Sequence, residues 1–375
     1  HRHFRRQRQM CIRDSYMARW KAVNWTRYQR ILSMLADQGH TIHVIQMPAS
    51  NSDETNFQEI KINLSPNIHL HELKFDGPFW RAKYPFHKIF RKGMFSLACI
   101  PVVKKMVKQY DIDVMIVYNL TQYPLIKAAN CFTVFDYADD YLDMLKFELG
   151  LFHNPAIIGL ARSILHRLVK EADLTLTVSR VLADSLQDIK SVQVVPNGVD
   201  LSKFNVKAVA STNHRYKSPV VGFLGSFEYF IDFDVILNAA KNLPEYTFLM
   251  VGSGRRFGEV ERKAKLMKLK NVVLTGSVPF HQVPEYINSM DICLNIFKDM
   301  PVSHGASPIK LFEYLAFKKP VISTRLDEVK IIDRDFLYYA DTAEELTSTL
   351  HQIVSEPASC NGKISSAYSL SLIHI

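Results

Sequence analysis

The chain has 375 residues, enough for two domains with cores of their own, and its 47% hydrophobic and 22% charged residues are typical of a globular protein. No apolar run reaches the roughly 18 residues of a membrane-spanning helix. The five cysteines form no Cys-x-x-Cys pair, so neither a zinc site nor a disulfide framework is indicated, which fits a reducing cytoplasm.

The formal net charge is +9, but residues 1–15 hold five arginines and one aspartate and contribute +4 of it. The rest of the chain is only mildly basic, which argues against nucleic-acid binding. The segments 1–15 and 358–375 have no periodicity and resemble translated sequencing-adapter sequence. We therefore interpret both as non-native and leave them out of the fold prediction. The first strand of the N-terminal domain would then be missing, and the recorded chain incomplete.

From Trp25 onward, helical and strand patterns alternate. Residues 25–39 predict an amphipathic helix that ends at Gly39. Short apolar runs bounded by polar residues then predict buried parallel strands, at 41–46, 67–75, 113–119, 132–137 and 173–179. This half closes with VQVVPNGVD, a strand that runs into an Asn-Gly turn.

Residues 205–219 lack periodicity and predict a linker, after which the alternation restarts. The second set of strands is expected at 220–226, 246–254, 271–278, 292–297 and 320–324, with a last helix over 341–356. Two successive βα runs predict an α/β protein with two doubly wound Rossmann-like domains, 16–204 and 220–357, facing a central cleft.

The stretch SPIKLFEYLAFKKPVIST (307–324) predicts a helix start, a helix and a strand. Ser307 is a favourable N-cap, Pro308 fits the first helical position, and Ile309 follows. Residues 305–307 lead in with backbone N–H groups that could point at an anion.

Lys310 and Glu313 are three residues apart and share a face of this helix. A lysine beside a helix start can pair with phosphate, and a glutamate one turn later can accept hydrogen bonds from the vicinal diol of a ribose. The stretch therefore suits a nucleoside diphosphate. The alternative is an ordinary salt bridge between these two side chains on a solvated helix.

VGSGRRFG (251–258) places glycines after a strand and before a helix, as a nicotinamide-binding site would. Their spacing is G-x-G-x-x-x-G, and no acidic residue ends the next strand to hold a ribose, so a nicotinamide enzyme is the weaker reading.

Four segments of the C-terminal half together resemble the GT-B glycosyltransferases, in particular the retaining family-4 type that uses nucleotide-diphosphate sugars. These segments are VVPNGVDLSKF, VGFLGSFEYFIDFDVI, NVVLTGSVPFHQVPEYINSMDICLNIF and SPIKLFEYLAFKKPVIST. In the N-terminal half, RYQRILSMLADQGHTIHVI and VFDYADDY resemble a branch of the same group. The resemblance covers about residues 20–355. It implies transfer of a sugar from a nucleotide-diphosphate donor, without a cofactor or a metal.

The resemblance assigns Glu313 to the second glutamate of the family's Glu-x7-Glu motif, which binds the donor ribose. Gly305 stands where the first glutamate would fall. The arginine and lysine that usually follow the first C-domain strand are also missing. Lys310 is expected to take over the contact with the diphosphate, with Arg255 or Arg256 as weaker candidates, because the leaving group needs a cation.

Further donor-binding positions follow from the same alignment of motifs. They are expected at Gly225 and Ser226, at Gly252, at Ser277 and Val278 beside the nucleobase, and at Asn197 and Gly198, together with Ser307, Pro308 and Ile309.

DYADDY (136–141) ends a predicted strand of the N-terminal domain and is expected to face the cleft. We expect Asp136 and Asp140 to act as catalytic residues that orient an acceptor hydroxyl, with Asp139 and Arg27 on the acceptor side. The alternatives are a Mg²⁺ site, a helix start rich in acids, and a surface salt bridge for Arg27.

Residues 79–95 mix aromatic with basic side chains, which suits a weak contact with an anionic membrane, although a helix packed on the domain is the alternative. The expected partners are the nucleotide-sugar donor and a saccharide or lipid-linked acceptor. The expected location is the cytoplasm, peripheral at the inner face of the membrane. A hypothesis of a different class is a catalytically inactive nucleotide-sugar-binding module, which the glycine at 305 would favour.

Overall fold

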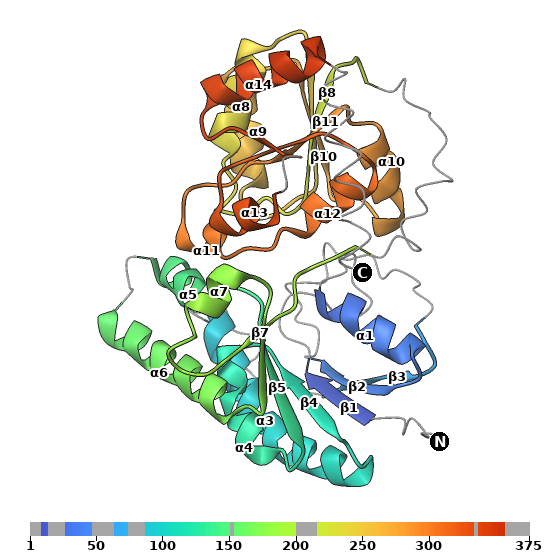
Figure 1. The fold of residues 1–375 in the computed structure, drawn as a ribbon, viewed down its shortest axis with the longest axis vertical. Helices are drawn as coiled ribbons and strands as arrows, with labels where there is room; N and C mark the ends of the chain where they lie inside the picture. Colours follow the sequence, from blue (N-terminus) through green and yellow to red (C-terminus); the bar gives the residue numbers. More distant parts are fainter. Residues whose placement is uncertain are drawn as a thin grey trace. The chain divides into compact units, whose positions relative to one another are not determined.

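The computed structural model describes residues 9–13, 27–46, 64–73, 87–150, 154–199, 216–333 and 337–356. The chain divides into two compact units, residues 1–195 and 196–375 (Figure 1). Each is an α/β unit built on a parallel sheet, as predicted.

The first unit contains a seven-stranded parallel sheet in the order β3-β2-β1-β4-β5-β6-β7. Its strands are β1 (Gln9–Arg13), β2 (Thr41–Gln46), β3 (Ile68–Glu72), β4 (Val114–Val117), β5 (Phe132–Tyr137), β6 (Leu174–Thr177) and β7 (Gln193–Val194). Its helices are α1 (Arg27–Asp37), α3 (His87–Gln109), η1 (Leu120–Gln122), α4 (Tyr123–Ala128), α5 (Tyr141–Leu149), α6 (Pro155–Glu171) and α7 (Arg180–Asp184).

Helices cover both faces of this sheet, because alternate residues of one strand enter different cores. Met115 and Val117 of β4 belong to a cluster with side chains of α3, α4 and α6. Val114 and Ile116 of the same strand pack instead against a cluster that contains residues of α1. This two-sided burial explains why the strands have continuous apolar runs rather than alternating polarity.

Residues 9–13 occupy a central position in the first sheet, which differs from the expectation that residues 1–15 lie outside the fold. Strand β1 pairs in parallel with β2 on one side, Met10 opposite Ile42, and with β4 on the other, Met10 opposite Val114. The segment therefore takes the place of the first strand, which was expected to be missing. The origin of its sequence stays a prediction.

The second unit contains a six-stranded parallel sheet in the order β10-β9-β8-β11-β12-β13. Its strands are β8 (Val220–Leu224), β9 (Thr247–Val251), β10 (Val272–Gly276), β11 (Ile292–Asn295), β12 (Val321–Ser323) and β13 (Tyr338–Tyr339). Its helices are α8 (Phe233–Asn242), α9 (Phe257–Leu266), η3 (Phe280–Gln282), α10 (Val283–Asn288), α11 (Pro301–His304), α12 (Ile309–Ala316), α13 (Asp327–Ile332) and α14 (Ala343–Ser355).

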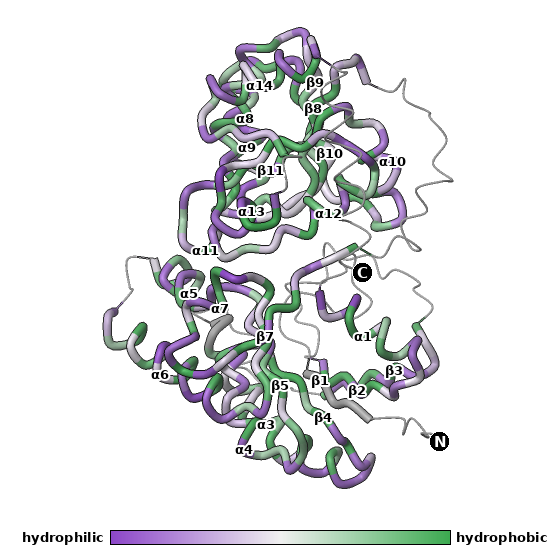
Figure 2. The backbone as a smooth tube through the Cα atoms, viewed as in Figure 1, coloured by the Kyte–Doolittle hydropathy of each residue, from purple (hydrophilic) through white to green (hydrophobic). Residues whose placement is uncertain are grey.

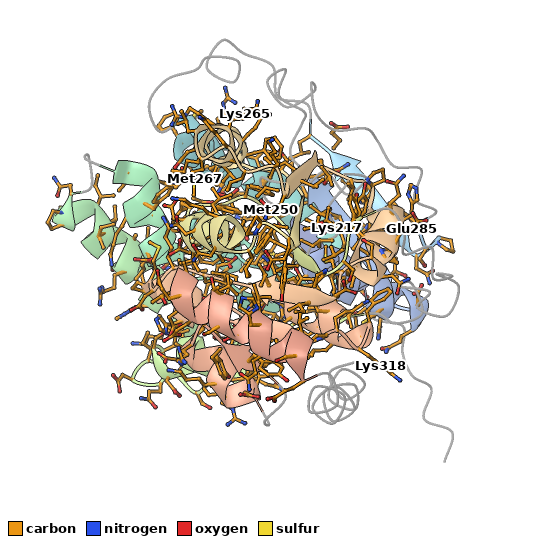
Figure 3. All side chains as sticks on the ribbon, turned by 90° about the horizontal axis from the view of Figure 1, so that it is seen from above. Lys217, Met250, Lys265, Met267, Glu285 and Lys318 are labelled. Atoms are coloured by element: carbon orange, nitrogen blue, oxygen red, sulfur yellow. The ribbon has the colours of Figure 1, made fainter. Side chains whose placement is uncertain are left out.

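One continuous core fills the second unit, and strands such as β8, β9 and β11 are coloured mainly as hydrophobic in Figure 2. Met250 of β9 lies among the interior side chains, whereas Lys265 and Lys318 lie at the outside (Figure 3). The strands β9, β8 and β11 are parallel neighbours, so their C-terminal ends lie on the same side of the sheet. Doubly wound sheets bind their ligands at the loops that follow these C-terminal ends.

The division between the units falls earlier than the expected linker. The first unit ends at Val195, whereas the sequence pattern extends the first domain to residue 204. The side chain of Val199 lies in the core of the second unit. The side-chain amide of Asn197 donates a hydrogen bond to the carbonyl of Ser307 at 2.7 Å. The Asn-Gly turn therefore belongs to the second unit. The expected linker residues 205–215 and the expected tail 358–375 lie outside the described residues.

Three histidines on β2 and β3, the two strands at one edge of the first sheet, form a cluster with a tyrosine. Nδ1 of His43, on β2, lies 3.0 Å from Nε2 of His71, on β3. The ring of His43 also stacks on those of Tyr110 and His69, with centroids 4.3 Å and 5.1 Å away. Burial and the two neighbouring histidines lower the pKa of His43 to about 4. The folded unit therefore favours the neutral imidazole.

This cluster predicts that the first unit loses stability in mild acid. A histidine in the unfolded chain binds a proton near pH 6.5, whereas folded His43 does so near pH 4, so the unfolded chain binds more protons in that window. Stability should thus fall as the pH drops from about 6.5 to 4, by up to ~1.4 kcal/mol per pH unit. His43→Phe, which can still stack on Tyr110, should flatten the decrease in urea unfolding. The exposed His166→Phe is the control, and an equal slope in parent and His43→Phe would refute the assignment.

Candidate functional site

The expected donor-binding residues lie at the C-terminal ends of the strands of the second sheet. Gly225 and Ser226 directly follow β8, Gly252 follows β9, and Ser277 and Val278 follow β10. The loop after β11 leads through α11 into α12, which carries Lys310 and Glu313. Because these strands are parallel neighbours, segments far apart in the sequence end at the same side of the sheet.

The start of α12 differs in detail from the prediction. The helix begins at Ile309 with Pro308 as its N-cap, and Ser307 does not cap it. The hydroxyl oxygen of Ser307 instead accepts a hydrogen bond from the backbone N–H of Asn197 at 3.3 Å. A serine that is expected to cap its own helix thus joins the Asn-Gly turn to the helix start. Gly198 follows Asn197 in this turn.

Two of the N–H groups expected to face an anion are already used. Gly305 donates to the carbonyl of Pro301 at 3.2 Å, and Ala306 donates to that of Ser303 at 3.2 Å. Both bonds close the short helix α11 before α12 begins. The expectation that these two N–H groups serve a phosphate is therefore wrong, and the cationic side chain of Lys310 becomes the more important candidate.

Glu313 lies inside the protein and not on a solvated helix face. Its exposure is 5%, and the five residues from Leu311 to Ala316 that surround it in the helix are buried as well. Lys310, which is half-buried, makes no ion pair with the described residues. The alternative of a surface salt bridge between Lys310 and Glu313 is thus not what the structure shows.

The ammonium of Lys310 lies against two aromatic rings. Nζ is 4.3 Å from the centroid of the Phe223 ring and 5.3 Å from that of Phe297. Gly225 makes room for it, because a Cβ at that residue would lie 3.0 Å from Nζ, and its φ of +146° disfavours any other residue. Burial lowers the pKa of Lys310 to about 7, against the opposing field of Glu313.

The two arginines considered as weaker candidates already have acidic partners. Arg255 Nε lies 3.4 Å from a carboxylate oxygen of Glu228, and Arg256 Nη2 lies 2.5 Å from one of Glu259. Each would have to leave its partner, or bring a negative charge with it, to bind a diphosphate. Lys310 requires neither.

The glycines of VGSGRRFG have a structural explanation. A Cβ at Gly252 would lie 2.0 Å from the carbonyl oxygen of Gly225, and one at Gly254 would lie 2.7 Å from the backbone N and O of Phe227. These glycines therefore let the loops after β8 and β9 approach each other closely. A dinucleotide site is not needed to account for them.

In the first unit, Asp136, the next-to-last residue of β5, forms a buried pair with Arg27 of α1. Arg27 Nε donates to Oδ2 at 2.9 Å and Nη2 donates to Oδ1 at 3.3 Å, with exposures of 6% and 4% for the two side chains. The alternative of a surface salt bridge for Arg27 is wrong. Burial raises the pKa of Asp136, and Arg27 opposes that rise.

Asp140 and Asp139 lie in the turn after this strand. Asp140 is the N-cap of α5, and its Oδ1 accepts the N–H groups of Leu142 and Asp143, each at 3.1 Å. The helix-start alternative thus describes Asp140, and its catalytic role stays a prediction. Asp139 is exposed, yet the surrounding protein and the charge of Asp136 raise its pKa to about 7. Among the described residues, no group of acids, histidines or cysteines is placed to hold a metal ion.

Sequence reasoning missed the aromatic residues of the site. Phe223 and Phe297 are separated by 74 positions and meet only through the pairing of β8 with β11. Tyr314 was missed as well; its hydroxyl accepts the N–H of Leu224 at 2.8 Å and joins α12 to the end of β8. Phe223 and Phe297 lie in the apolar runs VVGFLG and ICLNIF, which predict only buried strands, so no local signal indicated them as part of a site.

Two family models match the chain, and each matches one half. The model described as Glycosyltransferase Family 4 matches residues 26–203, and that described as Glycosyl transferases group 1 matches residues 218–356. The two compact units, each built on a parallel sheet, define a protein of the two-domain Rossmann-like class. The chain is a member of the GT-B glycosyltransferases of the family-4 type.

Relatives and solved structures agree with this membership. The chain is 32% identical over 194 residues to the putative teichuronic acid biosynthesis glycosyltransferase TuaH of Bacillus subtilis, a match that covers 51% of this chain and 46% of that protein. The chain thus spans about half the length of this relative. Its fold is similar to that of sucrose-phosphate synthase from Thermosynechococcus elongatus, with a TM-score of 0.74 at 14% identity over 98% of this chain and 94% of the other. Anabaena HepE, solved in complex with UDP and glucose, gives 0.69 at 12% over 98% and 95%.

Proposed function

We propose that the protein transfers a sugar from a nucleotide-diphosphate sugar to a saccharide or lipid-linked acceptor of the cell envelope, with retention of anomeric configuration. The observation that carries the proposal is that Lys310 and the buried Glu313 lie together on α12, which follows the C-terminal end of β11 in the second sheet. Lys310 offers a cation to the diphosphate, and Glu313 offers a carboxylate to the ribose diol. Stabilising the leaving diphosphate is the main chemical task in such a transfer.

The names of similar proteins support the choice of substrates. TuaH is named for teichuronic acid biosynthesis, and the HepE structure holds UDP and glucose. UDP-sugars are therefore the first donors to test, followed by GDP-sugars. In the first unit, the acceptor hydroxyl would be oriented by Asp136, near the end of β5, and by Asp139 and Asp140 in the turn that follows it.

The deciding experiment is a donor screen with purified protein. Release of UDP or GDP from a sugar nucleotide, and incorporation of labelled sugar into envelope glycans, would support transfer. Binding of a nucleoside diphosphate without any hydrolysis or transfer would support the inactive module instead. That alternative rests on Gly305, which leaves the sugar without the expected glutamate.

A weak contact with an anionic membrane is part of the proposal. Residues 79–86 lie outside the described residues, but the segment continues into α3, where Phe90, Met94 and Leu97 are 53%, 47% and 57% exposed. Their spacing places them on one face of the helix, and the exposed Lys104 and Lys105 lie farther along it. Within the described residues, no helix combines the length and apolar character needed to cross a membrane.

Co-sedimentation with vesicles tests this contact. We expect weak binding to vesicles that contain anionic lipid, decreasing with salt, because lysines near the surface supply much of the attraction. Leu97→Ser should reduce binding several-fold, whereas Leu266→Ser, which changes an exposed leucine on α9 of the second unit, should not. Equal binding to neutral and anionic vesicles, or none to either, would favour the packed-helix alternative.

A further inference from the structure

We propose that Phe223 and Phe297 form a π-electron cage that keeps the Lys310 ammonium charged and directed at the donor diphosphate, in place of a carboxylate partner. The inference rests on the proposed function for the identity of the ligand. The two centroid distances, 4.3 Å and 5.3 Å, lie within the range of cation–π attraction. The two rings come from the ends of two different strands, β8 and β11, so the ammonium has two aromatic neighbours that are far apart in the sequence.

An aromatic cage has an advantage over an acidic partner at this position. A carboxylate in contact with Lys310 would neutralise it and repel the incoming diphosphate. A π face stabilises the ammonium while carrying no net charge, so the full positive charge remains available to the phosphates. The arginines of the neighbouring loop, which have glutamate partners, lack this property.

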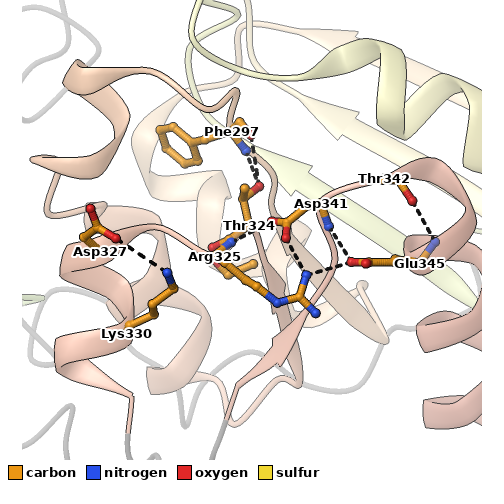
Figure 4. Close-up of polar contacts among 9 residues, drawn as sticks. Phe297, Thr324, Arg325, Asp327, Lys330, Asp341, Thr342 and Glu345 are labelled. Atoms are coloured by element: carbon orange, nitrogen blue, oxygen red, sulfur yellow. Dashed lines mark hydrogen bonds and ion pairs between the residues drawn. The ribbon is translucent and has the colours of Figure 1, made fainter.

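The fold holds both rings firmly. Phe223 is fully buried at the end of β8. Phe297 follows β11, and the hydroxyl of Thr324 binds its backbone twice, accepting its N–H at 2.8 Å and donating to its carbonyl at 3.0 Å (Figure 4). Phe230 stacks on the Phe297 ring with a centroid distance of 5.8 Å and an interplanar angle of 6°. The cage is thus fixed before any ligand binds.

The cage matters because Lys310 is easily deprotonated. Burial lowers its pKa to about 7, and Glu313, one turn along α12, is the charged group whose field favours the protonated form. Near neutral pH a small loss of stabilisation would therefore remove the charge from a large fraction of molecules. Nucleoside diphosphate should bind the protonated form, so its affinity should fall as the pH rises past about 7.

Phe297→Leu tests the cage, because it removes a π face and keeps an apolar side chain. The pKa of Lys310, followed by NMR of lysine labelled with ¹³C at Cε, should fall by about one unit without any ligand. Phe297→Tyr should restore it. Phe230→Leu, which removes the ring that stacks on Phe297 and leaves both rings of the cage in place, is the matched control and should leave it unchanged. If Phe297→Leu does not fold, Phe297→Met replaces it. An unchanged pKa overturns the cage.

UDP titration at pH 7.5 separates the cage from a general packing effect. Phe297→Leu should weaken UDP binding by about tenfold in the parent and should have no further effect in the Lys310→Met background. Equal weakening in both backgrounds overturns the proposal, because the ring would then act independently of the lysine. If the pKa of Lys310 shifts as expected but the parent binds neither UDP nor GDP, the aromatic cage around Lys310 is supported and the proposed function is refuted.

Discussion

Lys310→Ala is expected to lower the turnover number by a hundredfold or more, while the Michaelis constant for the donor rises much less. The negative charge on the leaving diphosphate grows as the glycosidic bond breaks, so a cation beside it stabilises the transition state more than the ground state. Among the described residues, Lys310 is the candidate cation that makes no ion pair, whereas Arg255 and Arg256 each form an ion pair with a glutamate. Steady-state kinetics with the donor found in the screen measures both constants.

Two further variants distinguish this role from a general effect. Lys310→Arg should recover activity only in part, because the planar guanidinium needs more room than the gap beside Gly225 and the two rings provides. Arg255→Ala is the matched control on the neighbouring loop and should change turnover less than threefold. If Lys310→Ala keeps near-normal turnover and Arg255→Ala abolishes it, the diphosphate contact belongs to the other loop.

Local sequence patterns predicted both parallel sheets but missed strand β1, which completes the first of them. Apolar runs such as TFLMV, which is β9, are typical of a strand that is buried on both faces. Strand β1 has no such signal: QMCIR is five residues long and lies among arginines, and only its pairing with β2 and β4 defines it. Pairing partners far away in the sequence are what a local pattern cannot contain.

The candidate site shows the same limit. Lys310 and Glu313 were found because both lie on one short helix, where spacing fixes their mutual position. The capping role of Ser307 was predicted wrongly because its partner, Asn197, lies 110 residues earlier. The aromatic neighbours of Lys310 come from two other strand ends, so the sequence did not reveal that its amine is held by rings. Asp140 is the opposite case, since its capping bonds are local and the acidic turn indicated them as an alternative.

Arg27→Met is expected to destabilise the first unit by about 3–5 kcal/mol, because it leaves the Asp136 carboxylate buried without its partner. Arg325→Met is the matched control. It breaks ion pairs with Asp341 and Glu345 (Figure 4), but these side chains are 38–46% exposed, so the cost should stay below about 1 kcal/mol. Chemical unfolding followed by circular dichroism measures both.

The pH dependence and a double variant show whether the buried charge causes the loss. Without Arg27, burial alone acts on Asp136, so its folded pKa rises further above the unfolded value of about 3.9. A carboxyl group with a raised folded pKa is most favourable to folding at low pH and loses that contribution as the pH rises through the folded pKa, so the damage in Arg27→Met should shrink in acid. Arg27→Met with Asp136→Leu should recover most of the stability, since apolar side chains can replace a buried ion pair. A double variant as unstable as the single one would show that Arg27 stabilises the unit through its other contacts. A stable double variant that no longer transfers sugar would assign the pair to the acceptor side of the reaction.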